Sequence, residues 1–422
     1  MNINPLKRRN HEAEEHALFM SLLESPTRPA FIGMARYCES MGYAGEAGDF
    51  YLGIVPDTFK QKYAIEEAQL IRPGQAVARE RLVEYMPETY KLAAPLNQDK
   101  NRNKVFELTS ITSKHTFFDS FRDADYETDG SETLLLDKQG NPVHCYSSRN
   151  RCLLRTNPGY QNTQVHKLAG VTVSLVTRNG HNFYHWMMDV LCKLDLLEAA
   201  GIRIEEVDHF IVSGLNYAFQ KKTLEMMGIA KSQLIDLQYS LHRFHCENIL
   251  MPHIPNTMGR TMSIRVTGFL RRKLLPLSSR TSPVGKKIAI HREKRGVKNR
   301  DEVKAVLLKH GFDVVQSENH SFEDQISIFA NASHVVSPHG AGLANLVFCK
   351  PGTKVFEFYG EQIQPPFWII AELQRLKYWN INCGSMLEHG EADNNKDLEK
   401  RLNAEMHVDV DYLENWIVQN CD

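Results

Sequence analysis

The sequence predicts an α/β protein with two Rossmann-like, parallel-sheet halves that face each other across a cleft, preceded by an N-terminal helical module. Two series of short apolar strands alternate with helical segments, a pattern typical of parallel sheets joined by crossover helices. A Ser/Thr/Pro/Gly-rich stretch at 277–285 separates the two series and has linker composition. A glycine-containing turn at 338–342 then follows an apolar strand of the second series.

Four regions follow in order along the chain. Residues 1–98 are predicted to form the helical module, because apolar residues recur at helical spacing and prolines and glycines divide them into short helices. Residues 99–276 are predicted as the first half, with strands at 171–176 and 210–212. Residues 277–385 form the second half in this prediction, with strands at 287–291, 312–315, 333–336 and 354–358. Residues 386–422 are expected to be a helical tail.

Composition and charge exclude several classes of protein. The 422 residues carry a net charge of −1, which argues against a dedicated nucleic-acid-binding surface. No apolar run approaches the roughly 18 residues that cross a bilayer, so we expect a cytoplasmic protein, at most peripherally attached to the inner face of the membrane. The eight cysteines form no Cys-x-x-Cys pair and are expected to be reduced and buried rather than metal ligands.

The turn at His339, Gly340, Ala341 and Gly342 is the most informative feature of the chain. A strand that ends here and continues as a helix presents backbone N–H groups at a helix N-terminus, which favours phosphate binding. The two glycines permit close backbone approach, and the histidine adds a donor. The alternative interpretation is a turn that serves only tight packing of strand against helix.

A second motif lies about 150 residues upstream, at the start of a predicted helix. Asn182, His185 and Asp189 are spaced to share one helix face, beside the apolar stripe that packs into the core. A histidine next to an aspartate near a helix start suits a general base and its supporting group. The alternative is an N-terminal capping arrangement with a histidine satisfied in the core.

Cations and a carboxylate follow two strands of the second half. Arg292 and Arg295 come just after the strand at 287–291, where open α/β sheets bind ligands, and could neutralise a diphosphate. Glu357, near the end of its strand, could accept hydrogen bonds from a ribose. The alternative interpretation is that each of these charged side chains is simply exposed to solvent and binds no ligand. No Asp-x-Asp follows a strand of the α/β region, so we expect no metal and assign the diphosphate to protein cations.

These motifs together resemble glycosyltransferase family 61. The resemblance rests on the Asn182-Phe-Tyr-His185-Trp-x-x-Asp189 motif, on the spacing of Arg292, Arg295 and Asn299, on Ser321-x-Glu323-x-Gln325, on the His339 turn followed by Asn345, and on Pro351-Gly-x-x-Val-x-Glu357. The resemblance covers about residues 170–360, and it depends on the order in which these motifs follow one another along the chain. His291 departs from the serine that many members have before the first arginine, so donor preference is expected to differ.

The resemblance implies a GT-B-like fold and an inverting, metal-independent transfer of a sugar from a nucleotide sugar to a glycan or lipid-linked glycan, with no cofactor and with a UDP-sugar as the expected donor. It implies Asp189 as general base beside His185. It also implies that Arg292, Arg295 and the turn at His339 to Gly342 hold the diphosphate, and that Glu357 and Asn345 hold the ribose or nucleoside. A bacterial cytosolic enzyme of capsule or surface-polysaccharide synthesis fits the absence of a predicted anchor.

Two other functions stay open at this point. One is a nucleotide-sugar epimerase or hydrolase on the same scaffold, which would need no acceptor. The other is a non-catalytic glycan-binding scaffold protein that uses the helical module to organise partners. Sequence alone determines neither the sugar, the nucleotide, the linkage nor the oligomeric state.

Overall fold

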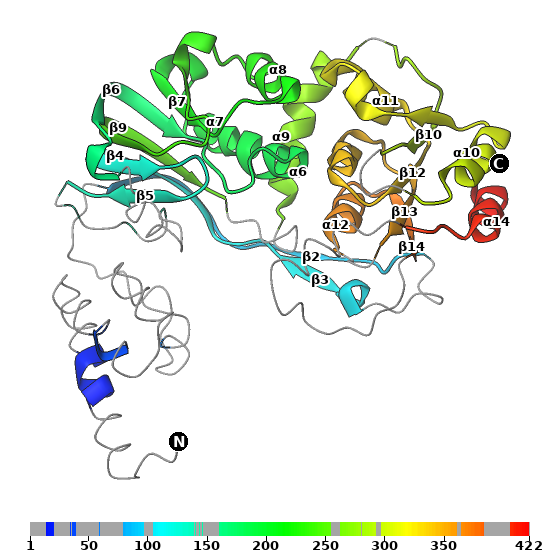
Figure 1. Cartoon of the computed structure of the whole chain (residues 1–422), viewed down its shortest axis with the longest axis horizontal. Helices are drawn as coiled ribbons and strands as arrows, with labels where there is room; N and C mark the ends of the chain where they lie inside the picture. Colours follow the sequence, from blue (N-terminus) through cyan, green and yellow to red (C-terminus); the bar gives the residue numbers. More distant parts are fainter. Residues whose placement is uncertain are drawn as a thin grey trace.

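A computed structural model of the chain describes two sheets with their helices. The described residues are 79–96, 104–138, 160–254, 262–279, 281–292, 297–360, 364–383 and 406–421, with the stretch 14–20 and a few isolated positions. We call residues 79–279 the N-half and residues 281–421 the C-half. Figure 1 shows the two sheets side by side, with helices packed between them. Most of the predicted helical module lies outside the described residues.

The N-half contains a mixed sheet. Its strands run in the order β1 (Arg79–Tyr85), β4 (Thr116–Thr128), β9 (His242–His253), β6 (Val165–Ser174), β7 (His209–Val212) and β8 (Leu234–Asp236), and β5 (Thr133–Leu136) pairs with β4. The pairs from β9 through β6 and β7 to β8 are parallel, whereas β1, β4, β5 and β9 pair antiparallel. Only the part around β6 to β8 is therefore Rossmann-like.

Two predictions for the N-half were wrong. Residues 79–91 were assigned to the helical module, yet they form β1 and β2 (Thr89–Lys91). The strands predicted for the first half also omitted the long strand β4, because it carries many charged residues. Inside the sheet Asp119 is fully buried and pairs with Arg79, at 2.8 Å, and with Arg81. When charged side chains pair with one another inside a sheet, the strand that carries them lacks the apolar pattern by which a strand is predicted.

The C-half contains the parallel sheet that the sequence predicts. Its strands run in the order β11 (Asp313–Val315), β10 (Lys287–Ile290), β12 (His334–Pro338), β13 (Lys354–Tyr359) and β14 (Lys377–Asn382). All neighbouring pairs are parallel. From β10 the chain moves to one side, to β11, and then crosses back to β12 on the other side. The crevice between β10 and β12 is thus the topological switch point, where such sheets bind ligands.

Helices cover both faces of the C-half sheet and fill the space between the halves (Figure 1). In the C-half, α10 (Arg300–Lys309) and α14 (Val410–Asn420) lie on the outer face, and α11 (Phe322–Asn331), η11 (Ala341–Phe348) and α12 (Pro366–Leu373) lie toward the N-half. The N-half contributes α6 (Phe183–His185), η5 (Trp186–Val190), η6 (Leu191–Lys193), α7 (Leu194–Ala199), α8 (Ala218–Met226), α9 (Ile264–Leu274) and η9 (Leu275–Leu277). The predicted tail includes α14, whose Trp416 stacks on Phe356 with ring centroids 4.6 Å apart. Short 3-10 turns are η2 (Lys104–Glu107), η4 (Tyr160–Asn162), η7 (Ile204–Glu206), η8 (Lys231–Gln233) and η10 (Ser317–Asn319).

The two halves share one hydrophobic core. Buried side chains of the N-half and of the C-half form a single continuous cluster, which includes Trp186, Phe269, Leu346 and Trp368. A ribbon of β2 and β3 (Ser110–Thr112) leaves the N-half and runs beneath it toward the C-half (Figure 1). After β2, the carbonyl of Ala93 accepts a hydrogen bond from Nε1 of Trp368, at 3.1 Å. The halves are thus packed against each other directly.

Arg271 joins the halves through the C-terminal end of η11. From α9 its guanidinium donates to the carbonyl oxygens of Val347 and Cys349, the latter at 2.8 Å. Carbonyl groups at the C-terminal end of a helix receive no hydrogen bond from a later N–H of that helix, so an arginine side chain is a favourable cap for them. We expect Arg271→Ala to lower the free energy of unfolding by about 2 kcal/mol, the usual loss for bonds from a charged donor.

Arg272 is the matched control for that prediction. It lies on the same helix, but its side chain is 54% exposed. It pairs with the exposed Glu198 and with the buried Asp195, which also has Arg265 as a partner. Arg272→Ala is expected to cost under about 1 kcal/mol. Urea unfolding of both variants measures the difference, and equal losses would mean that Arg271 does not fasten η11 to the N-half.

Candidate active site

The segment that carries Asn182, His185 and Asp189 is wound irregularly. Asn182 caps α6, with its side-chain oxygen accepting from the backbone N–H of Tyr184 at 2.9 Å. After one short turn the chain widens into the π-helical turn η5, in which the N–H of Leu191 donates to the carbonyl of Trp186. Every residue of η5 is buried. Wide turns of this kind occur often at functional sites because they re-aim single side chains.

His185 and Asp189 form the pair that the sequence predicts. Nδ1 of His185 lies 2.6 Å from Oδ2 of Asp189. A carboxylate can only accept, so the pair requires the proton on Nδ1 and leaves Nε2 of the neutral ring as an acceptor. The histidine side chain is 23% exposed and the aspartate side chain 9%. The imidazole is therefore the more accessible member, and the aspartate orients it.

His339 makes an equivalent pair with Glu357. Its Nδ1 lies 2.6 Å from Oε1 of Glu357, and the imidazole is 23% exposed. The other carboxylate oxygen accepts from the phenols of Tyr378, at 2.5 Å, and Tyr359, at 3.1 Å. Burial first, and then the charge of Glu357, raise the pKa of both phenols well above the usual value, so both stay protonated and donate.

The structure does not place Glu357 or Asn345 where a ribose could reach them. Glu357 lies inside β13 rather than at its end, has no exposed surface, and has its oxygens occupied by His339 and the two tyrosines. Asn345, in η11, is also completely buried and donates to Gln325 Oε1 at 3.2 Å. The strand-end argument failed because β13 extends to Tyr359. Glu357 thus orients His339, as Asp189 orients His185.

Arg292 explains one of the two glycines of the turn. Its guanidinium donates to the carbonyl of His339 and lies over Gly340. A Cβ at position 340 would lie 2.9 Å from Nε of Arg292 and closer still to the rest of the guanidinium. At Gly342, in contrast, a Cβ would meet only Ser317 Oγ, at 3.9 Å. Gly340 is therefore needed for Arg292, whereas Gly342 leaves open space at the first turn of η11.

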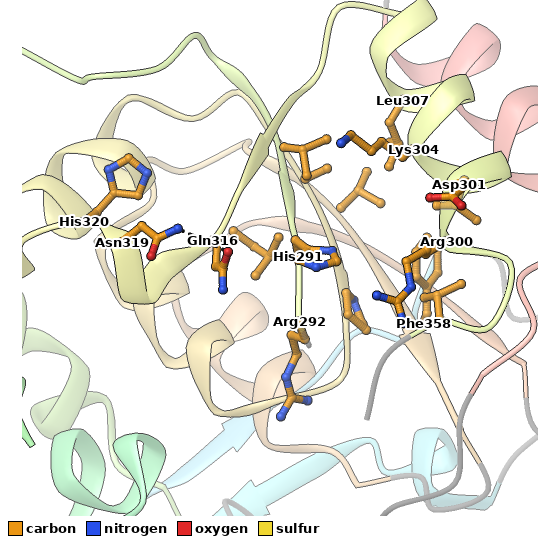
Figure 2. A pocket seen from close by; sticks show the side chains of 17 residues that line it. His291, Arg292, Arg300, Asp301, Lys304, Leu307, Gln316, Asn319, His320 and Phe358 are labelled. Atoms are coloured by element: carbon orange, nitrogen blue, oxygen red, sulfur yellow. Dashed lines mark hydrogen bonds between the residues drawn. The ribbon is translucent and has the colours of Figure 1, made fainter. Parts of the chain in front are cut away.

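A cationic pocket of about 540 Å³ opens at the switch point between β10 and β12. Its lining includes Ile290, Pro338 and Phe358, at or next to the carboxyl ends of β10, β12 and β13. In Figure 2, Arg300 and Lys304 extend from α10 on one side, and Gln316, Asn319 and His320 lie on the other. His291 lies between them and Arg292 forms the edge nearest η11. Three cations and one carboxylate, Asp301, suit an anionic ligand.

Aromatic contacts link the two histidine–carboxylate pairs across a region that we call the junction, where α6 of the N-half packs on η11 of the C-half. Tyr184, next to His185, packs edge-on against Phe367, with centroids 5.7 Å apart. Phe367 also contacts the ring of His339, at 5.1 Å. Arg292 then connects the His339 turn to the cationic pocket.

Other predicted site residues lie elsewhere or outside the described residues. Arg295 falls in 293–296, outside them. Asn299 does not face the pocket; its side-chain amide exchanges two hydrogen bonds with the backbone of Val408, at 2.8 and 3.0 Å, and so holds the segment before α14. Asn182 is a helix cap, which was the alternative interpretation.

Sequence reasoning missed several contributors. Tyr359 was identifiable in principle, since it follows Glu357 by two residues in a strand and so shares its face. Arg300 and Lys304 follow Arg292 at the start of α10 and could have been grouped with it. Tyr378 and Phe367 gave no local signal, because they come from β14 and α12 and reach the site only through the fold.

Two further findings concern metal ions and membranes. Among the described residues no cluster of three or more His, Cys, Asp or Glu side chains is placed to hold a metal ion. In the same part of the chain, no helix combines the length and apolar character that crossing a bilayer requires.

The fold and the site together define the class: a two-half α/β protein with a cationic crevice at a parallel-sheet edge and two oriented histidines beside it. Comparison with known proteins gives the family. Residues 183–356 match the family described as Glycosyltransferase 61. A Beta-1,2-xylosyltransferase of Arabidopsis thaliana is 35% identical over 75 residues, 17% of this chain and 14% of that protein's length.

Proposed function

We propose that the protein is an inverting glycosyltransferase that moves a sugar from a nucleotide sugar to a glycan hydroxyl, with the halves acting in the manner of a GT-B enzyme. The observation that carries the proposal is the junction. Tyr184 and Phe367 link the histidine–carboxylate pairs of the two halves there, and Arg292 links the His339 turn to the cationic pocket at the switch point of the C-half sheet. A transferase needs two kinds of group near each other: a base that takes a proton from the acceptor, and cations that stabilise the leaving group.

In this proposal His185 is the group that takes the proton from the acceptor hydroxyl. It is more exposed than Asp189, and its Nε2 is the nitrogen left free by the carboxylate. Asp189 fixes the ring and stabilises the imidazolium that forms, the role a buried carboxylate has beside other catalytic histidines. This reverses the roles expected from the resemblance, in which Asp189 is the base.

The donor nucleotide occupies the pocket in this proposal, with its diphosphate toward Arg292 and the turn at His339 to Gly342. Arg292 is the cation shared by pocket and turn, and the first turn of η11 has N–H groups without acceptors inside the helix. Protein cations, rather than a metal ion, would then neutralise the departing diphosphate. Arg300 and Lys304 of α10 extend the positive surface.

The two glycines of the turn give a matched pair of variants for the diphosphate site. Gly340→Ala is expected to displace Arg292 and weaken UDP binding at least tenfold, with some loss of stability. Gly342→Ala has room for its methyl group and should fold normally. If the diphosphate lies against the first turn of η11, Gly342→Ala also weakens UDP binding. Calorimetric titration with UDP distinguishes these results, and unchanged affinity in both variants would remove the turn from the site.

The proposal is tested by following both products. The purified protein is incubated with UDP-, GDP-, CMP- and dTDP-sugars, with and without chelator and with an added panel of methyl glycosides, and free nucleotide and new glycoside are measured. Nucleotide release that needs an acceptor, survives chelator and yields a glycoside of inverted anomeric configuration is expected. Release with no acceptor and no new glycoside would favour the hydrolase or epimerase, and no turnover of any donor would favour the scaffold protein.

We further propose a bacterial cytosolic setting, in the synthesis of a capsule or surface polysaccharide on a glycan or lipid-linked glycan. This rests on the resemblance alone. Detection of the protein in the soluble and peripheral membrane fractions of a producing cell, with loss of surface polysaccharide on deletion, would support it.

A further inference from the structure

Three loops of the N-half carry exposed aromatic side chains that the proposed chemistry does not use. The loops follow β6, β7 and β8, whose carboxyl ends lie at one edge because these strands are parallel. They carry His181, which is exposed, Tyr217, which is 49% exposed, and Tyr239, which is 37% exposed. We call these three side chains the aromatic platform.

The backbone holds Tyr239 in an unfavourable conformation. Gln238 and Tyr239 have φ angles of 48° and 55°, both in the left-handed region that usually takes glycine or asparagine. Neither residue type is suited to this turn. Such conformations persist where the surrounding structure enforces them, and they concentrate at functional sites.

Two glycines make space for the Tyr239 ring. A Cβ at Gly214 would lie 2.6 Å from Cε2 of Tyr239, and one at Gly130 would lie 3.4 Å from Cδ1. Any larger residue at 214 would displace the ring. Asp236 ties the loops together, since its Oδ1 accepts from the N–H groups of Leu215, at 3.1 Å, and Gln238, at 3.2 Å. The ring is thus fixed in place although it is exposed.

The platform is one surface rather than three separate residues. The His181 and Tyr239 rings meet edge-on, with centroids 6.0 Å apart. Tyr217 belongs to the neighbouring loop after β7, which Asp236 ties to the Tyr239 turn through the N–H groups of Leu215 and Gln238. The rings alternate with polar, exposed side chains, among them Arg178 and Asn216. The platform is thus a small set of rings within a polar rim, not the large contiguous apolar patch that marks a protein-docking surface.

Ring contacts lead from the platform to the junction. Tyr217 stacks on Phe219, with centroids 5.6 Å apart and planes 12° from parallel. Phe219 packs edge-on against Phe183, at 5.1 Å, and Phe183 is two residues before His185. His181 is four residues before His185, in the same loop and helix. A molecule lying on the platform is therefore next to the segment that carries the proposed base.

We propose that the aromatic platform binds a sugar ring of the acceptor glycan, with the C–H face of the pyranose on Tyr239 and Tyr217. One face of a pyranose is apolar and its rim is covered with hydroxyl groups. It therefore matches flat, exposed aromatic rings bordered by polar side chains. This inference rests on the proposed function, because it takes the neighbouring junction as the place of transfer. The donor pocket in the C-half is separate from it.

The test measures sugar binding without nucleotide, on the full chain. Saturation-transfer NMR is recorded with methyl β-xyloside, methyl α-mannoside, methyl β-galactoside and methyl β-N-acetylglucosaminide, each alone. The wild type is expected to transfer saturation to the ring C–H protons of at least one of them. Tyr239→Ala and Tyr217→Ala are each expected to reduce that transfer by about fivefold or more, since each removes one stacking face.

Two variants serve as matched controls. Tyr239→Phe keeps the ring and should keep the signal, and Gln238→Ala changes the same turn without removing a ring. UDP titration of every variant checks that the C-half is intact. The inference is overturned if no glycoside gives a signal with the wild type, or if both alanine variants keep it. Failure of UDP to bind would instead count against the proposed function, because the sugar measurement does not depend on the nucleotide.

Discussion

The His185→Ala variant is expected to lose sugar transfer by about 10³-fold in kcat, within the range for removing a general base. The affinity for UDP should stay within about twofold of the wild type, because His185 belongs to the N-half and the proposed donor pocket to the C-half. Asp189→Asn should also lose most activity, since an amide in place of the carboxylate no longer fixes the Nδ1–H tautomer.

The chain offers a matched control for this prediction. His245 and Asp125 form a similar pair, 2.8 Å apart, but on β9 and β4 and both substantially exposed. His245→Ala should leave transfer unchanged. Full turnover by His185→Ala would exclude His185 as the base, and an equal loss in both histidine variants would point to a general effect on folding.

Replacement of Glu357 by alanine is expected to be among the most destabilising changes in the C-half, with a loss of about 3 kcal/mol or more. The carboxylate is fully buried and is the shared acceptor for His339, Tyr359 and Tyr378. Its removal takes the carboxylate acceptor from all three donors and opens a cavity between them. Tyr359 keeps the carbonyl of Gln364, at 2.9 Å, and Tyr378 keeps only the Tyr359 hydroxyl, at 3.0 Å. His339 also loses its orientation, so UDP affinity should fall as well.

Glu414→Ala is the control for that effect. Glu414 also accepts from two side chains, Lys309 at 2.7 Å and His310 at 2.9 Å, but at the surface. Its loss should cost under about 1 kcal/mol. Chemical unfolding of both variants gives the comparison, and a small loss for Glu357→Ala would show that the buried network is not a structural unit.

The C-half was predictable because its strands are apolar, short and separated by amphipathic helices. All four strands expected there are present, whereas α12, β14 and the short turn η10, among the described elements, were not predicted. The N-half was harder for a physical reason. In β4 the charged side chains pair across the sheet, as Asp119 does with Arg79 and Arg81, so the strand does not read as apolar. Residues 79–85 were predicted as helix, but they form the strand β1 because they pair with β4.

At the candidate site, sequence spacing predicted local pairs better than distant ones. His185 and Asp189 are four residues apart in a helical segment, and their pairing is confirmed. The partner of His339 lies 18 residues away on the next strand, so Glu357 was assigned to a ribose instead. The aromatic platform draws on three loops that only the order of β6, β7 and β8 brings together.

The central claim is that the C-half pocket binds the nucleotide while His185 acts on the acceptor. Calorimetric titration of UDP into wild type, Arg292→Ala and His185→Ala tests it most directly. We expect saturable binding to the wild type, equal affinity in His185→Ala, and at least tenfold weaker binding in Arg292→Ala. Binding that is unaffected by Arg292→Ala but lost in His185→Ala would contradict it, and would move the nucleotide to the N-half.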